Sequence, residues 1–487
     1  MSPDLFENKI SVDKTILKEY IHANSLIVAI DADAVLFHDR GKDMDKKGVL
    51  DRVKELEIHT VRVEFSDMYG VSRGKMVPAS RLDEVLEEGI NCAKPTFSLD
   101  LSYNIPPGTG TADEVNYEDM TIVPDPSTFM VIPYQEGHCR LIGDIYADGK
   151  PFPYSPRGLL KKVVGKYREK GLVPVSASEL EFFVFEAVED KFEYYCDKPS
   201  NVYTVGPRSD PKGLLPTLQR TLIEMGIEVL YINHEFFQSQ YEINWRHQEA
   251  LTMADQTFTF KMVCKELAFL HDLFVTFMAR PKNEMGGSGY HIHFSIEDAE
   301  TGKNLFDDPQ GKEGMSDLMR HFIAGQMAHA KAMTPFLAPT INSYKRYTLN
   351  SFAPYYLAWG LDNRTTYIRV PRERGGATRV ENRAACASAN PYLALAVTLI
   401  AGLDGIEKQL DPGDYYVGDI YTEEPGKFDT VPFYLQEAIE ELKKDEILCQ
   451  AIGEEIINNY IAVKMSEVER FRTCVTEWEF NEYFYHL

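Results

Sequence analysis

Apolar and polar residues alternate over several short stretches of the chain, which is the pattern of half-buried β-strands. Residues 57–66 (EIHTVRVEFS) alternate in this way and stop at Asp67-Met68-Tyr69-Gly70, a turn sequence. The strand-like stretch 74–78 (GKMVP) follows the turn. The pattern therefore predicts a β-hairpin.

A helix is predicted after the hairpin, over residues 79–88, because apolar positions recur at helical spacing and Gly89 can end the helix. The extended stretch 120–134 and the strand-like stretch 139–146 complete a small mixed domain. A domain boundary near residue 152 is favoured by three closely spaced prolines, Pro151, Pro153 and Pro156.

Longer elements are predicted beyond this boundary. Residues 175–187 are rich in Val and Phe, which indicates a strand. Helical periodicity predicts helices over residues 159–170, 213–225, 248–271 and 432–448.

The first 50 residues differ from the rest. They combine a short helical pattern and a strand-like stretch (25–37) with the charged run 39–48. This pattern predicts an N-terminal extension joined to the rest by a solvated linker.

Composition narrows the class of protein. With 487 residues and 44% hydrophobic content, the chain can form an ample core. A formal charge of −24 argues against nucleic acid as the main partner, because phosphate binding favours a positive field. The seven dispersed cysteines indicate reduced thiols. Since we find no signal peptide and no apolar run long enough to cross a bilayer, we expect a soluble, cytoplasmic protein without membrane contact.

Four polar stretches between residues 179 and 381 stand in apolar surroundings. Glu179 and Glu181 alternate within a predicted strand, so both carboxylates would face one side and repel each other unless a cation is bound. His291 and His293 show the same alternation after a glycine-rich turn. Further carboxylates lie beside β-branched or aromatic residues, at Glu235, Glu242 and Glu381.

This repetition predicts a metal and nucleotide site. A single Glu-x-Glu pair is more often a solvated strand face, and only its recurrence along the chain changes that interpretation. Five carboxylates with one or two imidazoles suit Mg²⁺ or Mn²⁺ better than zinc, because these cations prefer oxygen ligands.

Longer segments of the chain are also distinctive: ELEFFVF, NHEFFQSQYEI, GGSGYHIHFS, NSYKR, DNRTTYIRVP, TRVENR, ANPYLALA and AGLDGIE, with DPSTFMVIPY nearer the N-terminus. In this order they resemble the glutamine synthetase family, over residues 55–487. The resemblance implies an α+β fold, with a β-grasp-like domain (51–152) and a larger catalytic domain (153–487) after the extension (1–50). It also implies active sites between the subunits of a homo-oligomer, a dodecamer of two stacked hexamers.

Carried over residue by residue, the resemblance implies two Mg²⁺ or Mn²⁺ ions and ATP. One ion would be held by Glu181, Glu235 and Glu242. The other would be held by Glu179, His291 and Glu381. The nucleotide would lie against His293 and Ser295.

The resemblance also implies how L-glutamate and phosphate are bound. Gly287 would offer its backbone to glutamate, and Arg346 would bind the substrate carboxylate. Four arginines would surround the phosphates and the acyl phosphate, namely Arg364, Arg369, Arg379 and Arg383. Of these groups, Arg346, Arg364 and Arg383 would be catalytic, and Arg383 would also contact glutamate. Arginine suits these roles because its planar fork meets oxygens in pairs, although a surface ion pair is the alternative for each one alone.

These parts imply an ATP-dependent ligase. The γ-carboxylate of glutamate would attack the γ-phosphate of ATP, with metal ions and arginines offsetting the negative charge. An amine would then open the γ-glutamyl phosphate to give an amide.

Two positions that serve ammonia in the family are changed. Where the family's flap carries a glutamate before Ala-Pro, this chain has Phe352 before Ala353-Pro354. Where the family has Asp-Gly-Ser-Ser, this chain reads Cys92-Ala93-Lys94-Pro95. Phenylalanine can neither take a proton from ammonium nor attract a cation, so the site is expected to prefer an apolar amine.

The flap resembles the branch of the family that joins glutamate to polyamines, alkylamines or anilines. Aromatic surface near the metals would come from Phe236, Phe237 and Tyr290, unless these rings are core packing. We expect an organic amine, apolar or aromatic; if it is a weak base such as an aniline, it would arrive unprotonated. The alternatives are a glutamine synthetase that uses Asp100 or Glu114 for ammonia, a γ-glutamylpolyamine synthetase, and a non-catalytic relative.

Overall fold

The computed structural model describes residues 44–196, 202–348 and 351–487. By compactness the chain divides into Met1–Gly41 and Lys42–Leu487, and every described residue belongs to the second unit. The helix and strand expected in the first 37 residues lie outside the described residues. The domain limits at residues 50 and 152 stay predictions.

Helix α2 (Lys46–Glu55) begins inside the charged run that the sequence predicts to be a linker. The Asp45 side chain caps this helix by accepting a hydrogen bond from the amide of Gly48 at 2.8 Å. Val49 and Val53 are buried in the N-terminal core. From residue 46 onward the run is therefore a packed helix, because apolar residues at helical spacing give it a buried face.

The N-terminal sheet has the strand order β2-β1-β6-β4-β3, and two short strands, β5 and β7, also pair with β6. β1 and β2 form the predicted antiparallel hairpin, whereas β1 and β6 are parallel. The strands are β1 (Thr60–Ser66), β2 (Ser72–Pro78), β3 (Ile90–Ala93), β4 (Asp119–Pro124), β5 (Met130–Val131), β6 (His138–Ala147) and β7 (Lys150–Pro151).

The hairpin turn is held by its own residues. The Asp67 carboxylate accepts hydrogen bonds from the amides of Tyr69 and Val71, both at 2.9 Å. Gly70 adopts a φ of 79°, which glycine tolerates. The helix predicted after the hairpin is present as α3 (Leu82–Glu88), which ends at Gly89.

The larger sheet is organised around the 17-residue strand β8 (Leu172–Val188). Its strand order is β10-β11-β8-β14-β17-β16-β15, with β9, β12 and β13 also paired to β8. The strands are β9 (Lys191–Tyr194), β10 (Val229–His234), β11 (Gln240–Trp245), β12 (Gln248–Glu249), β13 (Phe274–Thr276), β14 (Tyr290–Asp298), β15 (Trp359–Leu361), β16 (Ile368–Val370) and β17 (Val380–Asn382).

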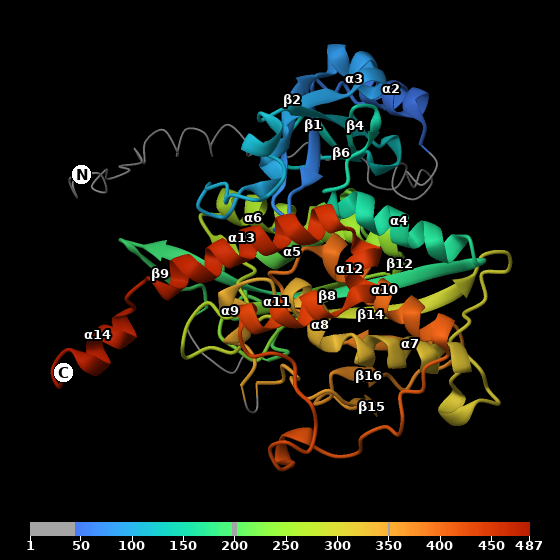
Figure 1. Ribbon diagram of the computed structural model, residues 1–487. Helices are drawn as coiled ribbons and strands as arrows, with labels where there is room; N and C mark the ends of the chain where they lie inside the picture. Colours follow the sequence, from blue (N-terminus) through green and yellow to red (C-terminus); the bar gives the residue numbers. More distant parts are fainter. Residues whose placement is uncertain (1–43, 197–201, 349–350) are drawn as a thin grey trace. The chain divides into compact units, whose positions relative to one another are not determined.

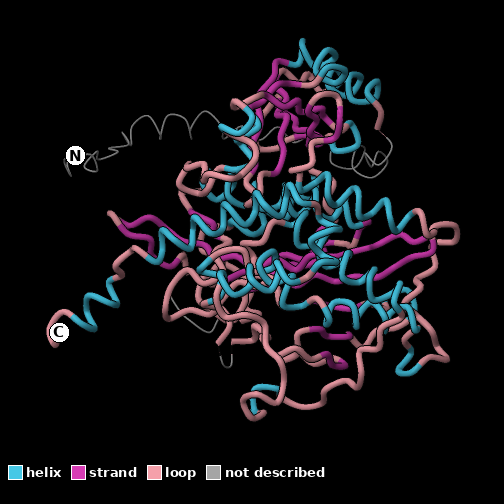
Figure 2. Tube along the Cα trace, viewed as in Figure 1, coloured by secondary structure: helices cyan, strands magenta, loops and turns pink. Residues whose placement is uncertain are grey.

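Figure 1 labels the helices and strands that surround β8, and Figure 2 shows helices in cyan and strands in magenta. Helix α10 is almost wholly buried and packs against α4, α6, α7 and α8. The helices are α4 (Pro156–Arg168), α5 (Leu214–Glu224), α6 (Ala250–Leu270), α7 (Asp317–Ala328), α8 (Ala330–Leu337), α9 (Ile341–Tyr344), α10 (Pro391–Lys408), α11 (Leu435–Lys444), α12 (Glu446–Ile452), α13 (Glu454–Arg472) and α14 (Glu477–Tyr483). The helices predicted near residues 159–170, 213–225 and 248–271 are confirmed, and the mixed architecture confirms the α+β class.

The two faces of β8 have different roles. Leu180, Phe182 and Val184 point into the main core, in which α6 packs against the sheet. Glu179 and Glu181 alternate with them and therefore lie on the opposite face. Among the helices of the described residues, none has the length and apolar character needed to span a bilayer.

Candidate functional site

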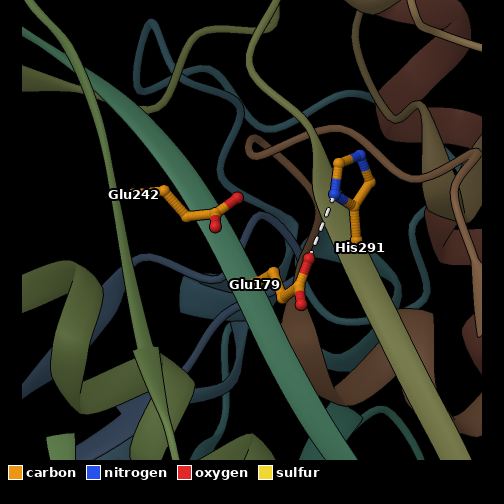
Figure 3. Close-up of side chains that lie close together, drawn as sticks. All are labelled: Glu179, Glu242 and His291. Atoms are coloured by element: carbon orange, nitrogen blue, oxygen red, sulfur yellow. Dashed lines mark ion pairs between the residues drawn. The ribbon is translucent and has the colours of Figure 1, made fainter. Parts of the chain in front are cut away.

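Strand register places the acidic residues side by side. On β11, Glu242 pairs with Glu181 and Asn244 pairs with Glu179 of β8. On the other side of β8, His291 of β14 also pairs with Glu179. Directly paired residues share a face of the sheet, so these polar side chains all point to the same side. Figure 3 shows Glu179, Glu242 and His291 close together on this face.

A second row continues across the sheet. His293 of β14 pairs with Glu381 of β17, and Glu381 pairs with Arg369 of β16. Glu235 enters from the turn after β10, where its amide donates a hydrogen bond to the carbonyl of Gln240 at 2.8 Å. The six carboxylate and imidazole ligands expected from the sequence thus come from four strands and one turn of a single sheet.

Glu179 lies at the centre of the polar face. One of its carboxylate oxygens is 3.0 Å from Nε2 of His293, and the other is 3.5 Å from Nδ1 of His291. Ligand atoms within 4.8 Å of one another form two triads, Glu179 with Glu242 and His291, and Glu179 with His293 and Glu381. The resemblance divides these residues differently, since it makes His293 a nucleotide contact and groups Glu242 with Glu181 and Glu235.

Amide side chains hold the remaining carboxylates. Glu181 accepts hydrogen bonds from the Gly289 amide at 2.7 Å and from Nε2 of Gln240 at 2.9 Å. Asn244 donates to Glu242, and Asn233 donates to Glu235, each at 2.6 Å. Sequence reasoning missed these amides, although Gln240, Glu242 and Asn244 alternate in the same period-two pattern that identified Glu179 and Glu181.

Negative charge is distributed unevenly over the face. Burial, reinforced by nearby Glu235, raises the pKa of Glu181 to about 7. Burial and the neighbouring glutamates also raise the pKa of Glu242 well above its ordinary value. Burial opposes ionisation of Glu381 too, but Arg383 outweighs it and holds the Glu381 pKa at about 2. Without a cation, burial and neighbouring carboxylates therefore oppose ionisation of Glu181 and Glu242, whereas the charge of Glu381 is compensated.

Three of the predicted arginines contact the ligand residues directly. Arg369 donates to Glu381 at 2.6 Å, and Arg383 forms an ion pair with the same carboxylate. Arg379 donates through Nε to Nδ1 of His293 at 3.2 Å. Arg364 is exposed; its backbone carbonyl accepts a hydrogen bond from Nε of Arg383, and its guanidinium forms no ion pair with the described residues. The arginines therefore border the Glu381 end of the face.

Arg346 lies beneath the glycine-rich turn. It is 3% exposed, and its Nη1 donates to the carbonyls of Ala384 and Ala385 at 3.1 and 2.9 Å. A Cβ at Gly287 would lie 2.4 Å from Cγ of Arg346, so only glycine fits there. Ser295 continues the alternation of His293 on β14 and is half-buried.

The predicted aromatic residues divide into two groups. Phe236, next to Glu235, stacks on Phe352 with a centroid distance of 5.9 Å and planes 29° apart, and the two rings are 57% and 52% exposed. Phe237 instead packs against the cluster of Phe183, Phe185 and Met285.

Tyr290 does not line the site. It alternates with His291 along β14 and is fully buried on the other face, where its hydroxyl hydrogen-bonds with Ser178 at 3.1 Å. The expectation that Tyr290 adds aromatic surface near the metals is therefore wrong, because a period of two sends it to the core.

Comparison with known proteins decides the family. A family model described as "Glutamine synthetase, catalytic domain" matches residues 153–483. The chain belongs to the glutamine synthetase family. A glutamine synthetase of Pyrococcus abyssi is 36% identical over 442 residues, which is 87% of this chain and 96% of that relative. A glutamine synthetase of Halobacterium salinarum is 34% identical over 455 residues, covering 90% and 96% of the two chains.

Solved structures of the glutamine synthetase family agree with the fold. A structure described as "Apo GmaS without ligand" has a TM-score of 0.81 and 30% identity, covering 91% of this chain and 99% of that one. A structure described as "GmaS/ADP complex-Conformation 1" has a TM-score of 0.80 and 30% identity, covering 90% and 99%. As a glutamine synthetase family member, the chain is an ATP-dependent ligase that forms carbon–nitrogen bonds, in a family that uses divalent metals.

Proposed function

We propose that this chain joins the γ-carboxylate of L-glutamate to an organic amine, by way of γ-glutamyl phosphate. One observation carries the choice of amine. The exposed Phe236 and Phe352 rings stack next to the carboxylate face, at a position where the family resemblance leads us to expect an acid. Family membership supports the ligase chemistry, and the aromatic pair supports an apolar or aromatic acceptor.

Two Mg²⁺ or Mn²⁺ ions fit the donor set of the face. We assign one ion to Glu181, Glu235 and Glu242, and the other to Glu179, His291 and Glu381. Burial, together with Arg383, lowers the pKa of His291 to about 4, so its imidazole is neutral, the form that binds metals. A divalent ion would offset the repulsion that opposes ionisation of these glutamates, and it would polarise phosphate oxygens and favour transfer of the γ-phosphoryl group.

The arginines position the phosphates and glutamate. Arg364 is exposed and forms no ion pair with the described residues, so it can reach a phosphate. Arg369 and Arg383 already flank Glu381, and their remaining N–H groups can stabilise charge that develops on the transferred phosphoryl group. We assign ATP contacts to Arg364, Arg369, Arg379, His293 and Ser295. We assign glutamate contacts to Gly287, Arg346 and Arg383.

An ammonium pocket is not supported by the charges of this chain. At the segment that aligns with the family's aspartate, Lys94 is buried and pairs with Glu118 at 2.6 Å. Asp100 accepts hydrogen bonds from Ser102 and Asn104 and pairs with Arg470 at 3.1 Å. Glu114 accepts hydrogen bonds from two nearby backbone amides. These acids are thus committed within their own chain, which favours an uncharged amine.

The relatives favour different acceptors. GmaS is a γ-glutamylmethylamide synthetase, which supports an organic amine. The curated relatives are glutamine synthetases, which favours ammonia as the alternative. A polyamine acceptor would need carboxylates for its second ammonium group, and a non-catalytic relative would be expected to lose metal ligands. The dodecamer stays a proposal that rests on the family resemblance.

The test is ligase activity against a panel of amines. Phosphate release and amide formation are measured with L-glutamate, ATP and Mg²⁺, and with ammonia, methylamine, aniline or putrescine. We expect kcat/KM to be higher for methylamine or aniline than for ammonia. An equal or higher value for ammonia would support the glutamine synthetase alternative, and the highest value for putrescine would support the polyamine enzyme.

A matched pair of variants controls for the site. Glu242→Gln removes a carboxylate of the face, whereas Glu297→Gln removes one from the far end of β14. We expect Glu242→Gln to lower kcat by about 100-fold or more and Glu297→Gln to retain activity. Equal activities would exclude this face as the site of reaction.

A further inference from the structure

One cavity of the structure shares no lining residue with the carboxylate face. Its volume is about 870 Å³, and it is lined on one side by the β1–β2 hairpin and on the other by α6 and residues 276–278. None of the metal ligands or arginines assigned above lines it. The volume falls within the range of small-molecule sites, which is roughly 300–1,000 Å³.

Several charged residues at the cavity wall form ion pairs within the chain. Arg62 pairs with Glu266 at 2.7 Å, and Arg73 pairs with Asp67 at 2.9 Å. Glu64 is paired too, with Nη2 of Arg140 at 2.6 Å. These charged groups therefore need no ligand.

Three lysines of the wall form no ion pair with the described residues: Lys75, which is exposed on the hairpin, and two lysines of α6. Lys261 and Lys265 are four residues apart and so share one face of the helix. Neither forms an ion pair with any residue that the structure describes. Lys261 is 8% exposed, and its ammonium donates to the carbonyls of Ala387 and Ala389, at 2.9 and 3.0 Å. Two neighbouring ammonium groups without a counterion are unusual in a chain with a net charge of −24.

The walls beside the lysines are aromatic and apolar. The Phe277 ring lies 5.3 Å from the Lys261 ammonium and 5.9 Å from that of Lys265. Phe258, Met262 and Met278 also line the cavity. Burial, with repulsion from Lys265, lowers the pKa of Lys261 to about 7. This shift shows that charging Lys261 is unfavourable when no anion is nearby.

We infer that this cavity binds a small organic dianion, whose two acidic groups meet Lys261 and Lys265 and whose apolar or aromatic body lies on Phe277. Ionised acceptors form the stronger class of hydrogen bond with ammonium groups. Around buried Lys261, the apolar wall lowers the local dielectric and strengthens the attraction to an anion. The site is independent of the proposed ligase reaction, because it uses none of the same residues.

The probe is isophthalate, an aromatic ring with two carboxylates, titrated by calorimetry into the full-length protein. Its neutral analogue, 1,3-benzenedimethanol, has the same ring without charge. We expect saturable isophthalate binding that weakens as salt is raised, and no measurable binding of the analogue. Binding of the analogue as tight as that of isophthalate would overturn the inference, because the lysines would then be irrelevant.

Two lysine variants separate the site from general charge effects. Lys265→Gln removes an exposed member of the pair, so it is expected to fold, and isophthalate should bind at least tenfold more weakly. Lys162→Gln is the matched control, because Lys162 is also exposed and donates to a backbone carbonyl, that of Ala451. Affinity should be unchanged in this control.

Unchanged affinity in Lys265→Gln would overturn the inference. So would a change of oligomeric state in Lys265→Gln without loss of isophthalate affinity, because the cavity would then be a contact between copies of the chain. Inorganic phosphate serves as a second probe, and we expect it to bind more weakly than isophthalate because it lacks the ring. Equal or tighter phosphate binding would contradict the assigned aromatic body.

Discussion

The substitution Phe352→Glu tests the choice of amine directly. The Phe352 ring is half-exposed and stacks on Phe236 at 5.9 Å. Such aromatic contacts contribute about 0.5–1.5 kcal/mol beyond the buried area, so an aromatic amine on this surface should lose about 1 kcal/mol of transition-state binding. The new carboxylate should favour ammonium by about 1 kcal/mol, the upper end for an exposed pair. Together the two effects raise the ratio of kcat/KM for ammonia over aniline roughly 30-fold.

The assay compares kcat/KM for ammonia and aniline in the wild type and in Phe352→Glu. Phe192→Glu is the matched control, because Phe192 is similarly exposed and pairs with another ring, Phe274, on a different part of the sheet. Its ratio should stay at the wild-type value. An unchanged ratio in a folded, active Phe352→Glu protein would refute the placement of the amine against this pair.

Three further predictions concern charge and pH. In excess EDTA, Glu242→Gln should raise Tm by several degrees, because the variant lacks a buried carboxyl group whose ionisation is opposed by neighbouring glutamates. Added Mn²⁺ should stabilise the variant less than the wild type. The folded-state pKa of Glu181, about 7, lies above its ordinary value of 4.5, so the folded protein binds the extra proton. Without metal, the free energy of unfolding should therefore fall by at most about 3 kcal/mol as the pH rises from about 4.5 to 7. Urea unfolding measures this dependence, and saturating Mn²⁺ should abolish it. Burial opposes the charge of His329, but hydrogen bonds to Asp445 at 2.6 Å and Asp404 at 3.1 Å raise its pKa above 6.5. His329→Gln should thus lose most stability below pH 6.5, and the difference from wild type should shrink as pH rises through the folded-state pKa; a constant difference would contradict the assignment.

Faces of single strands were predictable from the sequence, whereas contacts between strands were not. Alternation places Glu179 and Glu181 on one side of β8 because the side-chain period of a strand is two. The pairing of β8 with β11 and β14 depends on register, which neither strand's pattern contains. For the same reason, the close approach of His293 to Glu179 could not be foreseen.

The predictions for the charged run and for the aromatic residues were wrong in part, because each local sequence pattern is compatible with two structures. A charged run with interspersed valines can be a linker or an amphipathic helix, and α2 is the helix because Val49 and Val53 find a core. An aromatic residue beside a ligand can line a pocket or fill the core. Phe236 and Phe237 are adjacent in sequence, yet one ring is exposed and the other is packed, because the turn directs them apart.

The carboxylates of the polar face and the stacked rings of Phe236 and Phe352 lie on different kinds of backbone segment. Apart from Glu235, the former are fixed by hydrogen-bonded ladders, whereas Phe236 and Phe352 lie outside the strands of the described residues. Substitutions in those segments can therefore change which nucleophile is accepted without disturbing phosphoryl activation. Evolution or protein engineering could thus change the amine specificity of this fold through substitutions around Phe236 and Phe352.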